Sequence, residues 1–411
     1  MEIITALIYV SAFILLYLTI TFIVLFALKH RGVHFKPKEL ADSELPTLSV
    51  VIPVYNEGES LRLGLDSILK SDYPKEKLEI IIVDDCSKDN SYEIAKEYEK
   101  YGFKAVKKEK NTGASDSKNV GIGMAKGELV ATLDSDSVVE SDSFRKLACY
   151  FADKGVGGVA AAIRVRNPKN ILEKVQAFEY DSILFLRRLM MTVDSIYVTP
   201  GGLSMFRKSA MKEIGGFDPQ SLTEDQEVAL KLQKKGYKLM CALDAFVYTA
   251  AMPRLDLLVK QRIRWVRGGI WNRIKHKDLF SLDYGDFLFF GMMTDLLVFI
   301  PSIILISSIL YGFIKPQAYW SDRIGLSNFA YGYVSDPIII VTACMVIITA
   351  VWLMYTVNNI RSYAKQKPIS LFREAPEMFV YLFVFGYIWP YIWITSLYME
   401  LAGKEKKWST R

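Results

Sequence analysis

Hydrophobic and polar positions divide the chain into apolar stretches near its two ends and a polar region between them. Residues 3–28 carry no charged side chain, and this run exceeds the roughly 20 apolar residues needed to cross a bilayer. Three further apolar runs, at about 287–314, 338–357 and 378–401, lie near the C-terminus. The pattern predicts a multi-pass membrane protein with one span before the polar region and three after it.

The charges beside these runs indicate the orientation. Lys29, His30 and Arg31 follow the first run directly, and positive flanks favour the cytoplasmic side. We therefore expect the polar region in the cytoplasm, at the plasma membrane. A cleaved signal peptide is disfavoured because the run is long and no basic segment precedes it. The basic loop 358–377 also suits the cytoplasm, but the basic tail "GKEKKWSTR" leaves the side of the last span open.

The polar region alternates between two periodicities. The segments "TLSVVIPVYN" (47–56), "LEIIIVDD" (78–85) and "ELVATLDSD" (128–136) are strand-like apolar runs with polar ends. Between them, Leu61, Leu65, Ile68 and Leu69 fall on one face of a helix, and "DSKNVGIGMAKG" is helical. Such alternation predicts an α/β fold with a mostly parallel sheet.

These patterns divide the chain into five parts. They are an N-terminal transmembrane helix (1–30), a cytosolic domain (45–250), interfacial helices (251–286), three C-terminal transmembrane helices with a basic cytosolic loop (287–401), and a tail (402–411).

Acidic clusters follow the predicted strands, at the edge where ligands bind in such sheets. Asp134 and Asp136 suit Mg²⁺ or Mn²⁺, which takes one or two carboxylates and phosphate oxygens, although a solvated turn explains them equally well. Asp84 and Asp85 can accept hydrogen bonds from a base N–H or a ribose hydroxyl. Ser87 or Asp89 can cap the helix that follows.

Two later segments complete the candidate chemistry. In "LTEDQEVALKLQKKG" (222–236), Thr223 is a plausible N-cap and Gln226 occupies the capping-box position, so helix-start chemistry alone accounts for Glu224 and Asp225. In "QRIRW" (261–265), two guanidinium groups and an indole precede the membrane; they suit diphosphate and sugar binding, or an amphipathic interfacial helix.

Composition excludes several classes of site. The four cysteines are scattered without CxxC spacing, and the three histidines are dispersed, so neither a disulfide framework nor a zinc site is expected. The net charge is only +6, and no nucleic-acid partner is expected.

The order of the motifs carries a resemblance. "VIPVYNE", "VDDCSKD", "DSD", "GG…GGF", "TED" and "QRIRW" occur in this order between residues 51 and 265. The chain thereby resembles the family 2 glycosyltransferases, in particular the membrane-embedded branch of cellulose, chitin, hyaluronan and poly-N-acetylglucosamine synthases. The resemblance implies a GT-A-like domain that binds a nucleotide sugar.

The resemblance also implies roles at matching positions. Asp225, with Glu224 beside it, would supply the general base, and Asp134 and Asp136 would hold Mg²⁺ or Mn²⁺. Gly201, Gly202 and Trp265 would face the acceptor. The donor, a UDP-sugar by resemblance, would contact Pro53, Tyr55, Glu57, Asp84, Asp85, Lys118, Asp134, Gln261, Arg262 and Arg264.

The implied reaction is inverting, metal-dependent transfer to a growing β-linked polysaccharide, with translocation across the membrane. Ala114 replaces a lysine that many processive members carry, which favours the alternative of transferring one sugar to a membrane lipid. Four spans are few for a polymer channel, so a pore would require a homo-oligomer. A catalytically silent scaffold is disfavoured because every required carboxylate is present.

Overall fold

The computed structural model describes residues 2–404 except 315–336, 364, 367 and 369–375. Its eight strands within this range are β1 (Leu48–Val54), β2 (Leu78–Asp84), β3 (Lys104–Lys107), β4 (Leu129–Leu133), β5 (Val138–Val139), β6 (Val156–Val165), β7 (Leu203–Arg207) and β8 (Lys238–Thr249). The longer helices are α1 (Glu2–Val33), α2 (Ser60–Leu69), α3 (Ser91–Glu97), α4 (Ala114–Met124), α5 (Ser143–Cys149), α6 (Ile171–Met191), α7 (Lys208–Glu213), α8 (Glu224–Lys234), α9 (Leu255–Lys275), α10 (Thr294–Ile314), α13 (Pro337–Tyr363) and α15 (Gly386–Leu401).

All these strands belong to one sheet, in the order β3-β2-β1-β4-β7-β6-β8-β5. The first four strands in that order are parallel, and β6 also runs parallel to β8. β7 is antiparallel to both β4 and β6, and β5 is antiparallel to β8. The prediction of an α/β fold with a mostly parallel sheet is therefore confirmed.

The sheet is buried on both faces, which explains its apolar strands. Along β1, Val50 and Ile52 pack on one side with residues of α2, α3 and α5. Val51 points to the other side, into a core that includes residues of α6, α7 and α8. Because side chains alternate across a strand, a strand covered on both faces needs a continuous apolar run. This core holds the strand ends, and the loops that follow them, in fixed positions.

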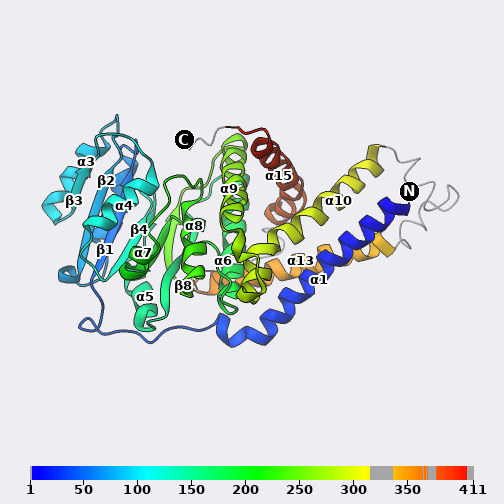
Figure 1. Ribbon diagram of the computed structural model, residues 1–411, viewed down its shortest axis with the longest axis horizontal. Helices are drawn as coiled ribbons and strands as arrows, with labels where there is room; N and C mark the ends of the chain where they lie inside the picture. The colour runs from blue at the N-terminus through cyan, green and yellow to red at the C-terminus, as the bar shows by residue number, and fades with distance from the viewer. Residues whose placement is uncertain (1, 315–336, 364, 367, 369–375, 405–411) are drawn as a thin grey trace.

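Three apolar helices extend away from the sheet. α1, α10 and α13 leave the sheet domain together, and α1 contacts both of the other two (Figure 1). Within the described residues, Ala6–Lys29 is the helical segment long and apolar enough to cross a bilayer. Part of the predicted basic loop 358–377, including Lys367 and Arg373, and most of the tail 402–411 lie outside the described residues.

α15 lies elsewhere, beside α9 and close to the sheet domain (Figure 1). The Arg267 guanidinium on α9 pairs with Glu400 of α15 at 2.6 Å and donates to the Lys404 carbonyl at 2.7 Å. Phe299 of α10 stacks on Trp393 of α15, with ring centroids 4.2 Å apart. The last helix is thus fastened to the helix that carries the QRIRW sequence.

Candidate active site

An acidic centre, defined here as Asp134, Asp136, Glu224 and Asp225, forms where β4 and α8 meet. Asp134 and Asp136 follow β4, and the two other carboxylates open α8. The buried Lys118 of α4 joins the two pairs, because its ammonium lies 2.8 Å from Glu224 Oε1 and 4.0 Å from Asp134 Oδ1. Residues separated by about a hundred positions are thereby brought to one place.

The backbone around Asp225 ties α8 to the loop before β7. The Thr199 amide and hydroxyl both donate to the Asp225 carbonyl, at 3.2 and 2.8 Å. One oxygen of the Asp225 carboxylate accepts from the Gln226 amide at 2.9 Å. The carboxylate therefore has a fixed direction at the first turn of α8.

Their surroundings give the two carboxylates of α8 different pKa values. Burial alone would raise the pKa of Glu224, but the Lys118 ammonium outweighs burial and holds that pKa below its usual range. Desolvation, and then the neighbouring Glu224 charge, raise the pKa of Asp225 to about 6. Asp225 is thus the more basic of the two, and it is partly exposed whereas Glu224 is buried.

Asp134 also holds a proton more tightly than an ordinary aspartate. Desolvation by the surrounding protein, with Asp136 and the α8 carboxylates nearby, raises the pKa of Asp134 to about 6 against the opposing effect of Lys118. Its side chain nevertheless remains 44% exposed, so a ligand from solvent can reach it. Four carboxylates here face the two cations Lys118 and Arg264, an imbalance that a divalent cation would relieve.

The two consecutive glycines before β7 have different surroundings. A Cβ on Gly201 would approach the Asp134 oxygens to 2.9 and 3.1 Å, so any side chain there would fill the space beside the carboxylate. A Cβ on Gly202 would instead lie 2.7 Å from Ile163 Cδ1, inside the domain core. Gly201 is therefore placed at the acidic centre, whereas the requirement at Gly202 comes from packing.

The side chains of the QRIRW sequence point to different surroundings. The Arg264 guanidinium donates to the Leu222 carbonyl at 3.0 Å, and its charge lowers the pKa of both α8 carboxylates. Arg262 is buried and pairs with Glu179 of α6 at 2.5 Å. Gln261 accepts from Arg262 at 2.8 Å, and the Trp265 ring lies against the Arg262 guanidinium. Arg264 thus joins the acidic centre, and Arg262 does not.

The proposed base-binding residues surround the ends of β1 and β2. Asp84 is fully buried; its Oδ2 accepts from the Ser87 amide at 3.0 Å, while its Oδ1 has no hydrogen-bond partner among the described residues. Asp85 accepts from the Lys108 ammonium at 2.7 Å and from the Gly113 amide at 2.7 Å. Asp84 therefore retains acceptor capacity, and Asp85 shapes the loop before α4.

The loop after β1 is interlocked with the loop after β2. Pro53 is buried within β1, and Tyr55 and Glu57 are partly exposed in the turn that follows. The Ser87 hydroxyl accepts from the Asn56 amide at 3.0 Å. Ser87 or Asp89 was expected to cap α3. The Ser87 hydroxyl is used between the loops, whereas Asp89 Oδ1 accepts from the Ser91 amide at the start of α3, at 3.1 Å.

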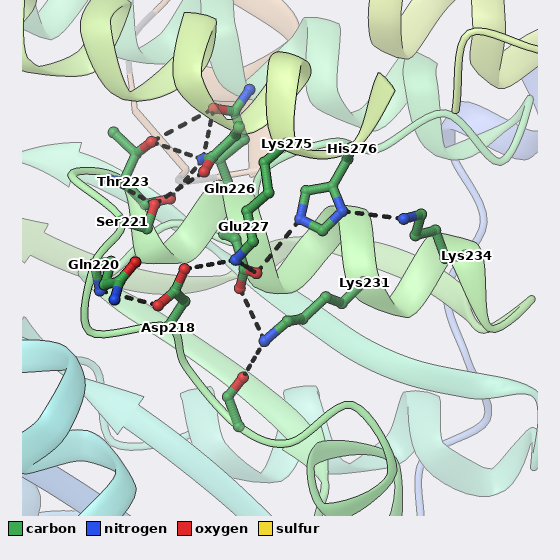
Figure 2. Close-up of polar contacts among 12 residues, drawn as sticks. Asp218, Gln220, Ser221, Thr223, Gln226, Glu227, Lys231, Lys234, Lys275 and His276 are labelled. Carbon is green, nitrogen blue, oxygen red and sulfur yellow. Dashed lines mark hydrogen bonds and ion pairs between the residues drawn. The ribbon is translucent and has the colours of Figure 1, made fainter. Parts of the chain in front are cut away.

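Polar contacts also fasten α8 to α9. Figure 2 shows the buried Glu227 among Lys231, Lys275 and His276. Glu227 lies 3.1 Å from the Lys231 ammonium, 2.9 Å from that of Lys275 and 3.4 Å from His276 Nε2. Lys275 also reaches Asp218 at 2.5 Å. These contacts join the helix that carries Asp225 to the helix that carries Arg264.

The start of α8 differs from the sequence prediction. Thr223 occupies the N-cap position, but its side chain makes no capping bond, and it accepts from Asn272 Nδ2 of α9 at 3.0 Å. The prediction of a capping box between Thr223 and Gln226 is therefore wrong. A tertiary contact has taken the hydroxyl that a local motif would use.

Several positioning residues of the site could not be found from the motifs. Glu179 and Asn272 act through partners on distant helices, so no local spacing reveals them. Lys108 contacts the nearby Asp116 as well as the distant Asp85. A buried charge in an amphipathic helix, such as Glu179 in "AFEYDS", was the available signal.

The fold and the acidic centre together define an α/β enzyme domain with carboxylates and an arginine gathered beyond the strand ends. Residues 49–215 match the family described as glycosyl transferase family 2. This part of the chain is therefore a domain of that family.

Curated relatives are similar to this chain over the same domain. The chain is 35% identical over 242 residues to a poly-beta-1,6-N-acetyl-D-glucosamine synthase of Staphylococcus epidermidis, a match covering 56% of this chain and 58% of the relative. It is 32% identical over 249 residues to the synthase of Staphylococcus aureus strain COL, covering 60% of each. The matched region thus spans less than two thirds of these relatives.

The solved structure of a mannosyltransferase from Pyrobaculum calidifontis, in complex with GDP-mannose and Mn²⁺, is similar in fold. Its TM-score is 0.61 at 20% identity, covering 85% of this chain and 99% of that chain. At this identity the similarity supports the fold alone.

Proposed function

We propose that the chain transfers N-acetylglucosamine from a UDP-linked donor to a growing β-linked polysaccharide at the membrane. The observation that carries this proposal is the meeting of Asp134, Asp225 and Arg264 at one centre in a family 2 domain. The similarity to poly-beta-1,6-N-acetyl-D-glucosamine synthases supports the choice of sugar and product.

The proton acceptor in this proposal is Asp225. As the acceptor hydroxyl oxygen bonds to the anomeric carbon of the donor, its proton passes to the Asp225 carboxylate. A pKa near 6 makes this carboxylate a stronger base than an ordinary aspartate while it stays ionised at neutral pH. Glu224 is less suited, because the Lys118 ammonium lies 2.8 Å from its Oε1.

The leaving group is the nucleoside diphosphate. The bond between the anomeric carbon and the diphosphate oxygen breaks, and its electron pair departs with the diphosphate. Arg264 provides a fixed positive charge beside the acidic centre for this developing negative charge. Direct displacement inverts the anomeric carbon, so an α-linked donor gives a β-linked product.

Mg²⁺ or Mn²⁺ fits beside Asp134 and Asp136. The described residues contain no group of three or more His, Cys, Asp or Glu side chains able to hold a metal. In such sites Mg²⁺ takes one or two carboxylates together with substrate phosphates. The space kept open by Gly201 and the excess of carboxylates support this fit. When bound, the ion would supply positive charge to the diphosphate oxygens.

The nucleotide base would bind at the ends of β1 and β2. The buried Oδ1 of Asp84 can accept a hydrogen bond from a base N–H, which would satisfy an atom left without a partner in the described residues. Tyr55, partly exposed in the turn after β1, would cover the base.

We place α1, α10 and α13 in the bilayer and α15 on the side of the sheet domain. The packing of α1 against the other two supports their insertion as a group. The fastening of α15 to α9 through Arg267 and Glu400 supports placing residue 404 on the cytoplasmic side. The chain would then cross the membrane three times rather than four.

Product length tests the proposed acceptor. The purified full chain is incubated in detergent with radiolabelled UDP-N-acetylglucosamine and Mg²⁺ or Mn²⁺, and the product is separated by gel filtration. We expect label in a high-molecular-weight fraction that a β-N-acetylglucosaminidase degrades. Label confined to a single-sugar glycolipid would replace the polysaccharide acceptor with a lipid.

A further inference from the structure

Arg262 is held in a buried ion pair with Glu179 of α6. Its Nη2 lies 2.5 Å from Glu179 Oε2, and both side chains are only 1% exposed. Its Nη1 donates to Gln261 at 2.8 Å. The pair joins α9 to α6 in the interior, where neither charge meets solvent.

The same guanidinium lies over the ring of Trp265. Its central carbon is 4.0 Å from the centre of the indole and 6.0 Å from the centre of the Tyr180 ring. Arg262 and Trp265 are three positions apart, so they share one face of α9. Glu179 thus fixes the Arg262 guanidinium, and this guanidinium packs against one face of the Trp265 indole.

Arg264 has the opposite relation to the site. The Arg264 charge lowers the pKa of both α8 carboxylates. Burial alone would lower the pKa of Arg262, but the Glu179 charge outweighs burial and raises it. To contact a diphosphate, Arg262 would have to leave a carboxylate buried without its partner, a strongly unfavourable change. Two arginines of one short sequence therefore have different partners.

We propose that Arg262 and Glu179 are positioning residues for Trp265, and that Arg262 is not a diphosphate ligand. This inference rests on the proposed function and on the expectation from the QRIRW sequence that Trp265 faces the acceptor sugar. The ion pair holds the indole at one angle, so that its free face is ready to stack on a sugar ring. Specificity for a cyclic, sugar-like acceptor thus depends on a carboxylate of α6, which does not itself touch the acceptor.

The test compares donor and acceptor constants in matched variants. Arg262→Lys and Glu179→Gln are measured beside Arg264→Lys, with UDP binding by calorimetry and transfer at varied concentrations of an N-acetylglucosamine oligosaccharide. We expect the first two variants, which displace the cation that supports the indole, to raise the acceptor KM by ~3–30-fold, up to the full energy of a cation–π contact, with UDP affinity changed less than twofold. Arg264→Lys should instead weaken UDP binding.

A double substitution separates positioning from folding. Replacing both members of the pair, as Glu179→Met with Arg262→Met, leaves no unpaired buried charge and should preserve the thermal midpoint while still raising the acceptor KM. UDP binding reduced by Arg262→Lys as much as by Arg264→Lys would overturn the proposal, as would an unchanged acceptor KM. Failure of the proposed function is distinguishable, because the wild-type chain would then turn over no donor.

Discussion

At the scale of single residues, the neighbouring carboxylates Glu224 and Asp225 have opposite properties. Lys118 holds Glu224 ionised, and Asp225 keeps the higher pKa. The sequence predicts that both belong to the site, because both are part of the TED motif. It does not separate them, because the separating charge comes from α4, about a hundred positions earlier.

The first prediction concerns pH. Because Asp225 must be ionised to accept a proton and its pKa is about 6, kcat/KM should fall about tenfold per pH unit below 6, rather than below 4. Asp134 titrates in the same range, so the profile is measured at saturating Mn²⁺, which favours its ionised form. An activity that stays constant down to pH 4.5 would exclude Asp225 as the base.

The second prediction concerns stability. A carboxyl group whose folded pKa is raised binds its proton more tightly in the folded state, so it stabilises the fold at low pH and destabilises it above pH 6. Asp225→Asn should therefore raise the thermal midpoint of the metal-free chain at pH 7.5, and the gain should shrink toward pH 5. Calorimetry at the two pH values measures both effects. A lower midpoint at pH 7.5 would show that the carboxylate stabilises the site.

At the scale of elements, the alternation of strands and helices could be predicted from the sequence because it follows from burial on both faces of a sheet. The junction of α8 with α9 could not be. Thr223, Asn272 and Glu227 have ordinary local interpretations, and their partners are fixed only when the two helices pack. The glycine that permits this packing, Gly268, carries no signal of its own in the sequence.

The third prediction tests that junction. A Cβ on Gly268 would lie 2.6 Å from Thr223 Cγ2, so Gly268→Ala should push α9 from α8, cost about 1–3 kcal/mol of unfolding free energy and lower transfer. Gly123→Ala in α4 is the matched control, since no heavy atom lies within 4 Å of its Cβ position. The control should be stabilised by about 0.5–1 kcal/mol. Equal effects of the two substitutions would argue against a close helix contact.

At the scale of the whole molecule, hydrophobic runs predict where apolar helices occur but not which of them leave the sheet domain. The runs at 287–314 and 378–401 are alike in composition, yet α10 extends with α1 while α15 lies along α9 (Figure 1). Contacts between distant positions accompany the difference, among them the Arg267–Glu400 pair and the packing of Val266 against residues of α15.

The fourth prediction locates the end of α15. In a chain with Cys86 and Cys344 replaced by serine, Lys404→Cys should react with a membrane-impermeant maleimide in inside-out vesicles and not in sealed right-side-out vesicles. Glu2→Cys should show the reverse pattern and serves as the control. Labelling of both cysteines from the same outer side would restore a fourth span.

The measurement closest to the central claim is release of nucleoside diphosphate from UDP-N-acetylglucosamine by the purified chain, with and without the Asp225→Asn substitution. If Asp134, Asp225 and Arg264 serve one bound nucleotide sugar, the wild-type chain should turn over the donor in the presence of Mn²⁺. The variant should bind UDP with unchanged affinity and lose about 10²–10⁴-fold in rate. Equal turnover by both proteins, or loss of UDP binding in the variant, would contradict this account.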